Sequence, residues 1–93
     1  MDKLPKITRV RPVGDYRLEI TFDDGAHGVH DFVWLFDRIG PMNEPLQDKA
    51  FFARVFLEVG ALAWPNGYDL SPWNIRRRMD EAGDLSLAEI AAE

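Results

Sequence analysis

The segment YRLEITF, at residues 16–22, alternates apolar and polar side chains without a break. This period of two is that of a β-strand with one buried face and one face in water. A Gly-Asp pair precedes the segment and Asp-Asp-Gly follows it, and both are turn sequences. We therefore expect ITRVRPV (7–13) and AHGVHDF (26–32) to pair with it in an antiparallel meander. Pro12 has no amide hydrogen to donate, which predicts an edge position or a bulge in the first strand.

The middle of the chain carries shorter signals. FVWLFDRIG (32–40) is apolar but too short for its periodicity to decide, and we interpret it as a short helix. Asp48 is placed to cap a helix over residues 48–55. VFLEVGALAW (55–64) indicates two short strands broken at Gly60, which predicts a second hairpin.

The C-terminal third begins with Ser71-Pro72, which is a strong helix start. Serine can accept from a free amide at the N-cap, and proline suits the first helical position because its missing N–H would have no partner there. We expect this helix to run to about residue 82 and to end at Gly83. The sequence SLAE at 86–89 matches a capping box and predicts a brief C-terminal helix or helical tail.

These elements predict a single domain over residues 1–93 of the α+β class. It should contain a mainly antiparallel sheet of about five short strands, with two or three short helices packed on one face. The sheet would combine the N-terminal meander with the second hairpin. A chain of 93 residues is too short to divide its core between two domains.

The composition excludes several classes of mechanism. The chain has no cysteine, so disulfides, thiolate metal sites and thiol nucleophiles are ruled out. Its longest apolar run, FVWLF at 32–36, is far shorter than the roughly 20 residues that span a bilayer, and MDKLPKITRV lacks the apolar region of a secretion signal. We therefore expect a cytoplasmic protein without membrane contact. A formal charge of −5 disfavours nucleic-acid binding unless one face is locally basic.

The two histidines, His27 and His30, invite a comparison with a metal site. Residues three apart on a strand point to opposite faces, so the pair cannot share an ion unless the strand is distorted, for example at Gly28. We interpret both as half-exposed strand histidines and predict no metal ligand.

The acidic residues near the meander do not form a convincing catalytic pair. Asp23 and Asp24 belong to a turn, where aspartates bond to their own backbone and stay solvated, so we expect no useful pKa shift there. The two serines are explained as helix caps, and no nucleotide-binding or nucleophile motif occurs. We predict no catalytic residue, no cofactor and no small-molecule substrate, and hence a protein that is not an enzyme.

Arg76, Arg77 and Arg78 form the basic cluster of the chain. Successive helical residues are about 100° apart, so the three side chains should fan around the helix and not form a stripe. Asp80 and Glu81 lie four residues beyond the first two arginines, which predicts pairing within the helix. Contact of the three arginines with phosphate or with an acidic partner is the alternative interpretation.

The segment WPNGYDLSP (64–72) has a specific pattern. A tryptophan ends a strand, Pro-Asn-Gly turns the chain, and an aspartate precedes the helix start. It resembles small bacterial proteins catalogued as domain of unknown function 2442, whose pattern is close to W-P-N-G-x-D-[LIV]-[SD]-P. The residues that meet this pattern are Trp64, Pro65, Asn66, Gly67, Asp69, Leu70, Ser71 and Pro72.

The resemblance extends upstream through the Asp24-Gly25 turn and through E-P-L followed by D-x-x-x-F at residues 44–52. It covers a family-like core at residues 6–76 and leaves a C-terminal extension at 77–93. The resemblance implies no established activity. Some relatives look like the N-terminal half of a larger protein with a helix-turn-helix domain, and some are encoded beside a small partner, as in toxin and antitoxin modules.

The motif has two interpretations. It can be an architectural corner, in which Asn-Gly takes positive φ, Asp69 accepts backbone amides and Trp64 packs beneath. It can also be a recognition surface, because an exposed loop carrying Tyr68 and Trp73 would suit an interface. The candidate motif or interaction residues are Trp64, Pro65, Asn66, Gly67, Tyr68, Asp69, Ser71, Pro72 and Trp73, and the candidate anion contacts are Arg76, Arg77 and Arg78.

The sequence favours a non-catalytic interaction module that binds a small protein partner or a second copy of itself, in the manner of an antitoxin-like accessory protein. The alternative is a DNA-associated regulator that uses the arginine-bearing helix. An enzyme of unknown type is the third possibility.

Overall fold

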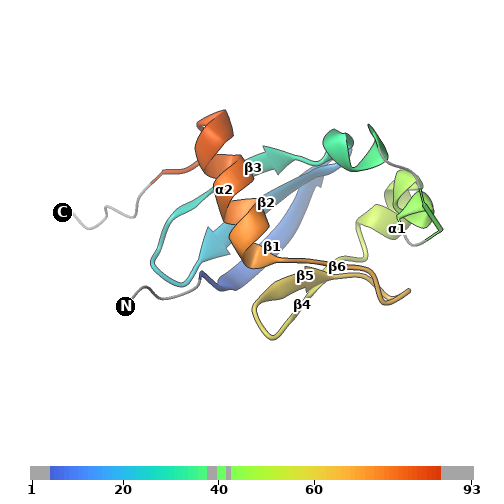
Figure 1. The fold of residues 1–93 in the computed structure, drawn as a ribbon, viewed down its shortest axis with the longest axis horizontal. Helices are drawn as coiled ribbons and strands as arrows, with labels where there is room; N and C mark the ends of the chain where they lie inside the picture. The colour runs from blue at the N-terminus through green and yellow to red at the C-terminus, as the bar shows by residue number, and fades with distance from the viewer. Residues whose placement is uncertain (1–4, 38–39, 42, 87–93) are drawn as a thin grey trace.

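The computed structural model describes residues 5–37, 40–41 and 43–86, and over these residues it is an α+β fold with two antiparallel sheets (Figure 1). The strands are β1 (Ile7–Gly14), β2 (Arg17–Phe22), β3 (His27–Asp31), β4 (Phe56–Glu58), β5 (Ala61–Ala63) and β6 (Asp69–Leu70). The helical segments are the 3-10 turns η1 (Val33–Asp37) and η2 (Glu44–Gln47) and the α-helices α1 (Lys49–Phe52) and α2 (Pro72–Ala82).

The first sheet has the strand order β1-β2-β3 and confirms the predicted meander. Leu18, Ile20 and Phe22 of β2 are all buried, while the residues between them are partly exposed, as the alternation predicts. The ladder between β1 and β2 shifts register between Pro12 and Gly14. Proline therefore lies on an edge strand beside an irregularity, where its missing amide is tolerated.

The prediction of one sheet of about five strands is wrong in detail. The second hairpin forms a separate three-stranded sheet with the order β4-β5-β6. The edge strand β1 meets the turn of this hairpin, where Ile7 N donates to Gly60 O at 2.9 Å. Val59 lies in that turn with φ +51°, so the first strand of the hairpin ends at Glu58, before the break that we predicted at Gly60. Because a turn presents few backbone groups in strand geometry, the ladder does not continue from one sheet into the other.

α2 is the helix that the sequence predicts best. Ser71 Oγ accepts from the amides of Trp73 and Asn74 at its start, and Gly83 ends it with φ +74°. The helix lies across one face of the first sheet (Figure 1). There it buries Ile75 and Met79, which stand one turn apart on the side facing the sheet.

The other predicted helices are shorter than expected. Asp48 caps α1 by accepting from Ala50 N, but the helix ends at Phe52 and the chain turns toward β4. Within the segment 32–40, Val33–Asp37 form the 3-10 turn η1, not an α-helix. The predicted C-terminal helix lies outside the described residues except for Ser86, whose backbone pairs with that of His27.

The core lies between the two sheets, α2 and the short helices, and it includes Leu62 and Leu70 of the second sheet. The largest fully buried side chains are Trp64, Phe22, Phe32, Phe52, Leu18, Ile20, Leu46, Leu62, Ile75 and Met79.

Within the described part of the chain, none of the helices has the length and hydrophobicity needed to span a bilayer.

Candidate functional site

The segment from Trp64 to Ser71, which we call the Trp64 corner, is built by short-range hydrogen bonds. Gly67 N donates to Trp64 O and Trp64 N donates to Tyr68 O, each at 2.9 Å. Gly67 has φ +93°, a conformation that a residue with a Cβ adopts only with strain. Asn66 Oδ1 accepts from Tyr68 N at 3.2 Å. The side chain that closes the bend is therefore Asn66, whereas we predicted Asp69, whose side chain is exposed.

The indole of Trp64 anchors this corner to the core. It is 1% exposed and donates from Nε1 to Phe52 O at 2.9 Å, so its polar atom has a partner despite burial. Tyr68 packs against it with ring centroids 5.9 Å apart. Burial, with a smaller contribution from the Asp69 carboxylate, raises the pKa of Tyr68. Pro65, Asn66 and Gly67 are exposed and Pro72 is partly exposed.

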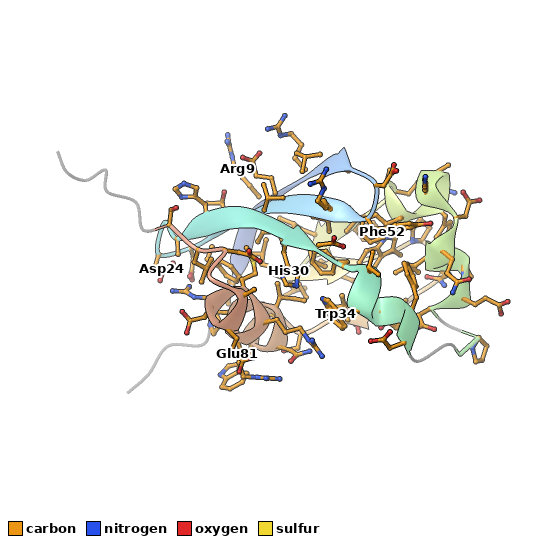
Figure 2. All side chains as sticks on the ribbon, turned by 90° about the horizontal axis from the view of Figure 1, so that it is seen from above. Arg9, Asp24, His30, Trp34, Phe52 and Glu81 are labelled. Atoms are coloured by element: carbon orange, nitrogen blue, oxygen red, sulfur yellow. The ribbon has the colours of Figure 1, made fainter. Side chains whose placement is uncertain are left out.

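His27 and His30 point to opposite faces of β3, as the strand period predicts, but they are not both half-exposed. His27 is exposed on the outer face, whereas His30 is 6% exposed and points toward α2 (Figure 2). The prediction failed for His30 because α2 and the residues after it cover the inner face of β3. Among the described residues, no group of three or more His, Cys, Asp and Glu side chains is arranged to hold a metal ion.

His30 is the centre of a set of four linked side chains that we call the His30 chain: Asp84, His30, Trp34 and Arg78. Trp34 Nε1 lies 2.9 Å from His30 Nε2, and Asp84 Oδ2 lies 2.7 Å from His30 Nδ1. An indole N–H can only donate, so Nε2 accepts and the neutral imidazole carries its hydrogen on Nδ1. That hydrogen is donated to the Asp84 carboxylate. The Arg78 guanidinium then lies over the Trp34 ring, 3.6 Å from its centroid.

Gly28 makes the approach of the C-terminal segment possible. A Cβ at this position would stand 1.9 Å from Asp84 O. No side chain larger than hydrogen fits there without displacing the segment. Two residues further on, Ser86 and His27 exchange backbone hydrogen bonds of 2.9 and 2.7 Å. Residues beyond the predicted family-like core are thus bound to β3.

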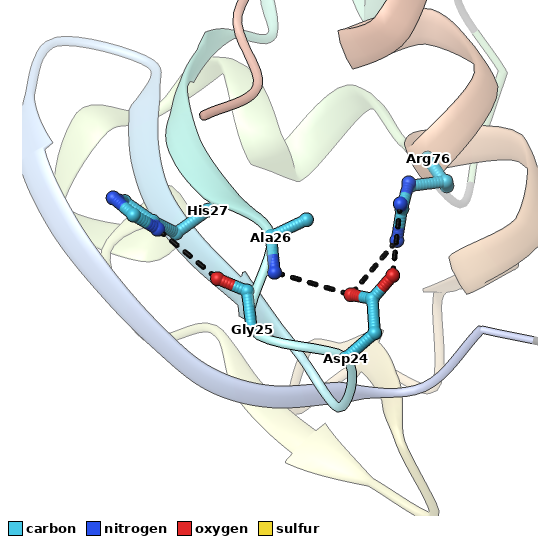
Figure 3. Close-up of polar contacts among 5 residues, drawn as sticks. All are labelled: Asp24, Gly25, Ala26, His27 and Arg76. Atoms are coloured by element: carbon cyan, nitrogen blue, oxygen red, sulfur yellow. Dashed lines mark hydrogen bonds and ion pairs between the residues drawn. The ribbon is translucent and has the colours of Figure 1, made fainter. Parts of the chain in front are cut away.

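The three arginines of α2 fan out as predicted, and each has a different neighbour. Arg76 forms a two-pronged pair with Asp24, with nitrogen to oxygen distances of 3.2 and 3.0 Å (Figure 3). It also lies over the Phe22 ring at 4.9 Å. The predicted partner of Arg76, Asp80, is therefore not the one it contacts. The hydrogen bond from Arg76 and that from Ala26 N lower the pKa of Asp24 despite partial desolvation, contrary to the prediction for the turn aspartates.

Arg77 and Arg78 differ in how their charges are matched. Arg77 confirms the predicted pairing within the helix, since its Nη1 lies 3.5 Å from Glu81 Oε2, and it also donates to Asn74 Oδ1 at 2.6 Å. Arg78 forms no ion pair with any described residue, and its buried Nε has no hydrogen-bond partner among them. The guanidinium over Trp34 is thus not paired with a carboxylate of any described residue.

Two hollows flank α2. One has a volume of about 380 Å³ and is bordered by Trp73, which is 53% exposed. The other, of about 310 Å³, lies between η1, the Trp64 corner and α2. The first is lined by Pro5, Trp73, Arg76, Arg77 and Asp80. The second is lined by Trp34, Leu35, Asp37, Asn43, Tyr68, Leu70, Asn74 and Arg78.

The sequence predictions missed Trp34, Asp84 and the burial of His30. The bond between His30 and Asp84 joins residues 54 positions apart, and that between Trp34 and His30 joins residues four positions apart but on different elements. No local sequence pattern specifies how these elements pack. The one available signal was Gly28 inside a strand, since glycine there often marks a close backbone approach. We read it as a possible distortion of β3, whereas it admits the C-terminal segment.

The family described as protein of unknown function (DUF2442) matches residues 7–80. The chain belongs to this family. The match includes the Trp64 corner and most of α2, and it ends before Asp84 and Ser86. No curated protein and no solved structure shows a significant match to the chain.

Proposed function

We propose that this DUF2442 protein is a non-catalytic interaction module that binds a small protein partner through the outer side of α2. The observation that carries the proposal is the exposure of Trp73. Trp73 is 53% exposed and lies in the first turn of α2. Its backbone is held there because the N-cap residue Ser71 accepts a hydrogen bond from its amide. Large aromatic side chains held on rigid elements are typical centres of protein interfaces, because they bury much area at little cost in conformational entropy.

The surroundings of Trp73 support this role. Arg77 lies beside the indole, with its guanidinium carbon 6.0 Å from the ring centroid. The adjoining hollow of about 380 Å³ gives a partner side chain a place next to Trp73. We therefore expect a partner that covers Trp73 with apolar atoms and presents a carboxylate to Arg77. An antitoxin-like accessory role is compatible with such a surface.

The test is capture of a partner from native extract with tagged wild-type protein and two alanine variants. Trp73→Ala should lose a stoichiometric companion protein that wild type retains. Phe56→Ala is the matched control, because Phe56 is an exposed aromatic residue on β4, 43% exposed. Recovery of no companion by wild type, together with a monomer in sedimentation velocity, contradicts the proposal. Equal loss with both variants contradicts the assignment to Trp73.

The alternative, a DNA-associated regulator, receives less support from the geometry. Arg76 is paired with Asp24 and Arg78 lies over Trp34, so the three arginines do not present a common basic surface. Binding to duplex DNA that weakens steeply with salt, and that is lost when all three become alanine, would replace our proposal with this one.

A further inference from the structure

We infer that the hollow between η1, the Trp64 corner and α2 is a small-molecule pocket that binds a zwitterion of the amino-acid class. Arg78 would receive the carboxylate and Asp37 the ammonium group. The site is separate from the Trp73 surface and does not depend on the proposed function. The hollow has a volume of about 310 Å³, within the size range of pockets for small ligands.

The first argument is the unmatched charge of Arg78. Its two neighbours on α2, Arg76 and Arg77, each lie within 4 Å of a carboxylate, at 3.0 and 3.5 Å. Arg78 has no such neighbour among the described residues, although its Nε is buried. A partly buried guanidinium without an anion is costly, so a site of this kind favours an anionic ligand.

The second argument is preorganisation. The Arg78 guanidinium carbon lies 3.6 Å from the centre of the Trp34 ring, which holds the group over the ring. Trp34 is itself fixed by its hydrogen bond to His30, and His30 by its bond to Asp84. A planar guanidinium held in this way presents two parallel N–H groups, the arrangement that matches a carboxylate.

The third argument concerns the rest of the lining, which selects among anions. Asp37 lines the same hollow and makes no ion pair with any described residue. Its negative charge disfavours a phosphate dianion but favours an ammonium group on the same ligand. Leu35, Leu70 and the Trp34 ring supply apolar surface for a short aliphatic side chain. The combination of one cation, one anion and an apolar wall fits an amino acid such as L-leucine.

The experiment is a titration of the full chain followed by NMR, with the indole N–H signal of Trp34 as the reporter. The probes are L-leucine, N-acetyl-L-leucine, L-leucinamide and inorganic phosphate. L-leucine should give a saturable shift, the acetylated and amidated forms should bind about tenfold more weakly or worse, and phosphate should give none. A phosphate shift as large as that of L-leucine overturns the inference, as does the absence of any saturable shift.

The variants assign the two charges. Arg78→Gln should weaken L-leucine binding about tenfold or more, whereas Arg9→Gln, which removes the same charge from the opposite face of the sheet (Figure 2), should not. Asp37→Asn should weaken L-leucine but leave N-acetyl-L-leucine unchanged, and it serves as the decisive variant if Arg78→Gln does not fold. Unchanged L-leucine binding in a folded Arg78→Gln, or in Asp37→Asn, overturns the corresponding assignment. Trp73→Ala should bind L-leucine normally even if its partner is lost, so the two proposals fail independently.

Discussion

The Trp64 corner and the His30 chain both position α2, but they are built in different ways. The corner begins the helix, and the backbone bonds of its bend, such as those between Trp64 and Tyr68, join residues no more than four positions apart. The His30 chain holds the far end of the helix, and its central bond joins His30 to Asp84, 54 residues away. Local bonds can be encoded in a short motif, whereas the long-range set depends on three separate elements meeting correctly.

The two regions also differ in whether their polar and charged groups already have partners within the fold. In the corner, the polar groups of Asn66 and Ser71 and the Trp64 indole are engaged in bonds to the backbone. In the His30 chain, the series of contacts ends at Arg78, which forms no ion pair with a described residue. A group whose bonds are complete inside the fold specifies structure, whereas an unmatched charge beside a hollow is available to a ligand.

The strongest way to break the corner is Trp64→Ala. It removes the largest side chain of the core and its bond to Phe52 O, so the free energy of unfolding should fall by about 3 to 5 kcal/mol. Urea denaturation measures this change, and Trp73→Ala, at an exposed position, should cost less than about 1 kcal/mol. If the two variants lose the same stability, the corner is not anchored in the core as we describe.

A weaker effect is expected when the His30 chain is broken by Asp84→Ala. His30 Nδ1 then loses its acceptor while the imidazole stays buried, which should lower the free energy of unfolding by about 1 to 3 kcal/mol. The indole N–H signal of Trp34 should shift at the same time. Asp84→Asn retains an acceptor oxygen and should preserve most of the stability. If Asp84→Ala leaves both the stability and the Trp34 signal unchanged, the hydrogen bonds of His30 do not couple Asp84 to Trp34.

The smallest effect concerns the pair between Asp24 and Arg76, a long-range contact at the surface. The folded protein lowers the pKa of Asp24 below its ordinary value of 3.8, so the pair stabilises the fold above that pH. This contribution is lost as the pH falls through the lowered pKa. The Asp24 side chain is 52% exposed, so water screens the pair and Asp24→Asn should cost less than about 1 kcal/mol at neutral pH.

The measurement for this pair is the free energy of unfolding as a function of pH. As the pH falls below 4, Asp24→Asn should lose less stability than wild type, because the variant has no carboxylate at this position to protonate. Asp80→Asn is the control, since Asp80 is exposed and the ion pair of Arg76 is made with Asp24 instead. A variant whose stability falls with pH as steeply as that of wild type would contradict the assignment to Asp24.

The sequence by itself determined the elements whose signals are local. Alternation specified β2, and Ser71, Pro72 and Gly83 specified both ends of α2, because a strand period or a cap involves only residues close in the chain. The membership of the family followed from the Trp64 corner for the same reason. At the caps of α2 and in the bend of the Trp64 corner, the hydrogen bonds to the backbone are made by residues that the motif contains.

Only the tertiary structure decided how those elements meet. It divided the strands into two sheets, because the backbone of β1 bonds to a turn residue, Gly60, and not to a strand. It also buried His30 under the segment for which Gly28 leaves room. It also paired Arg76 with Asp24 and left Arg78 over Trp34 beside the hollow. These contacts depend on distances between residues far apart in the chain, and such distances are set by the packing of the whole core, not by any pattern within one segment.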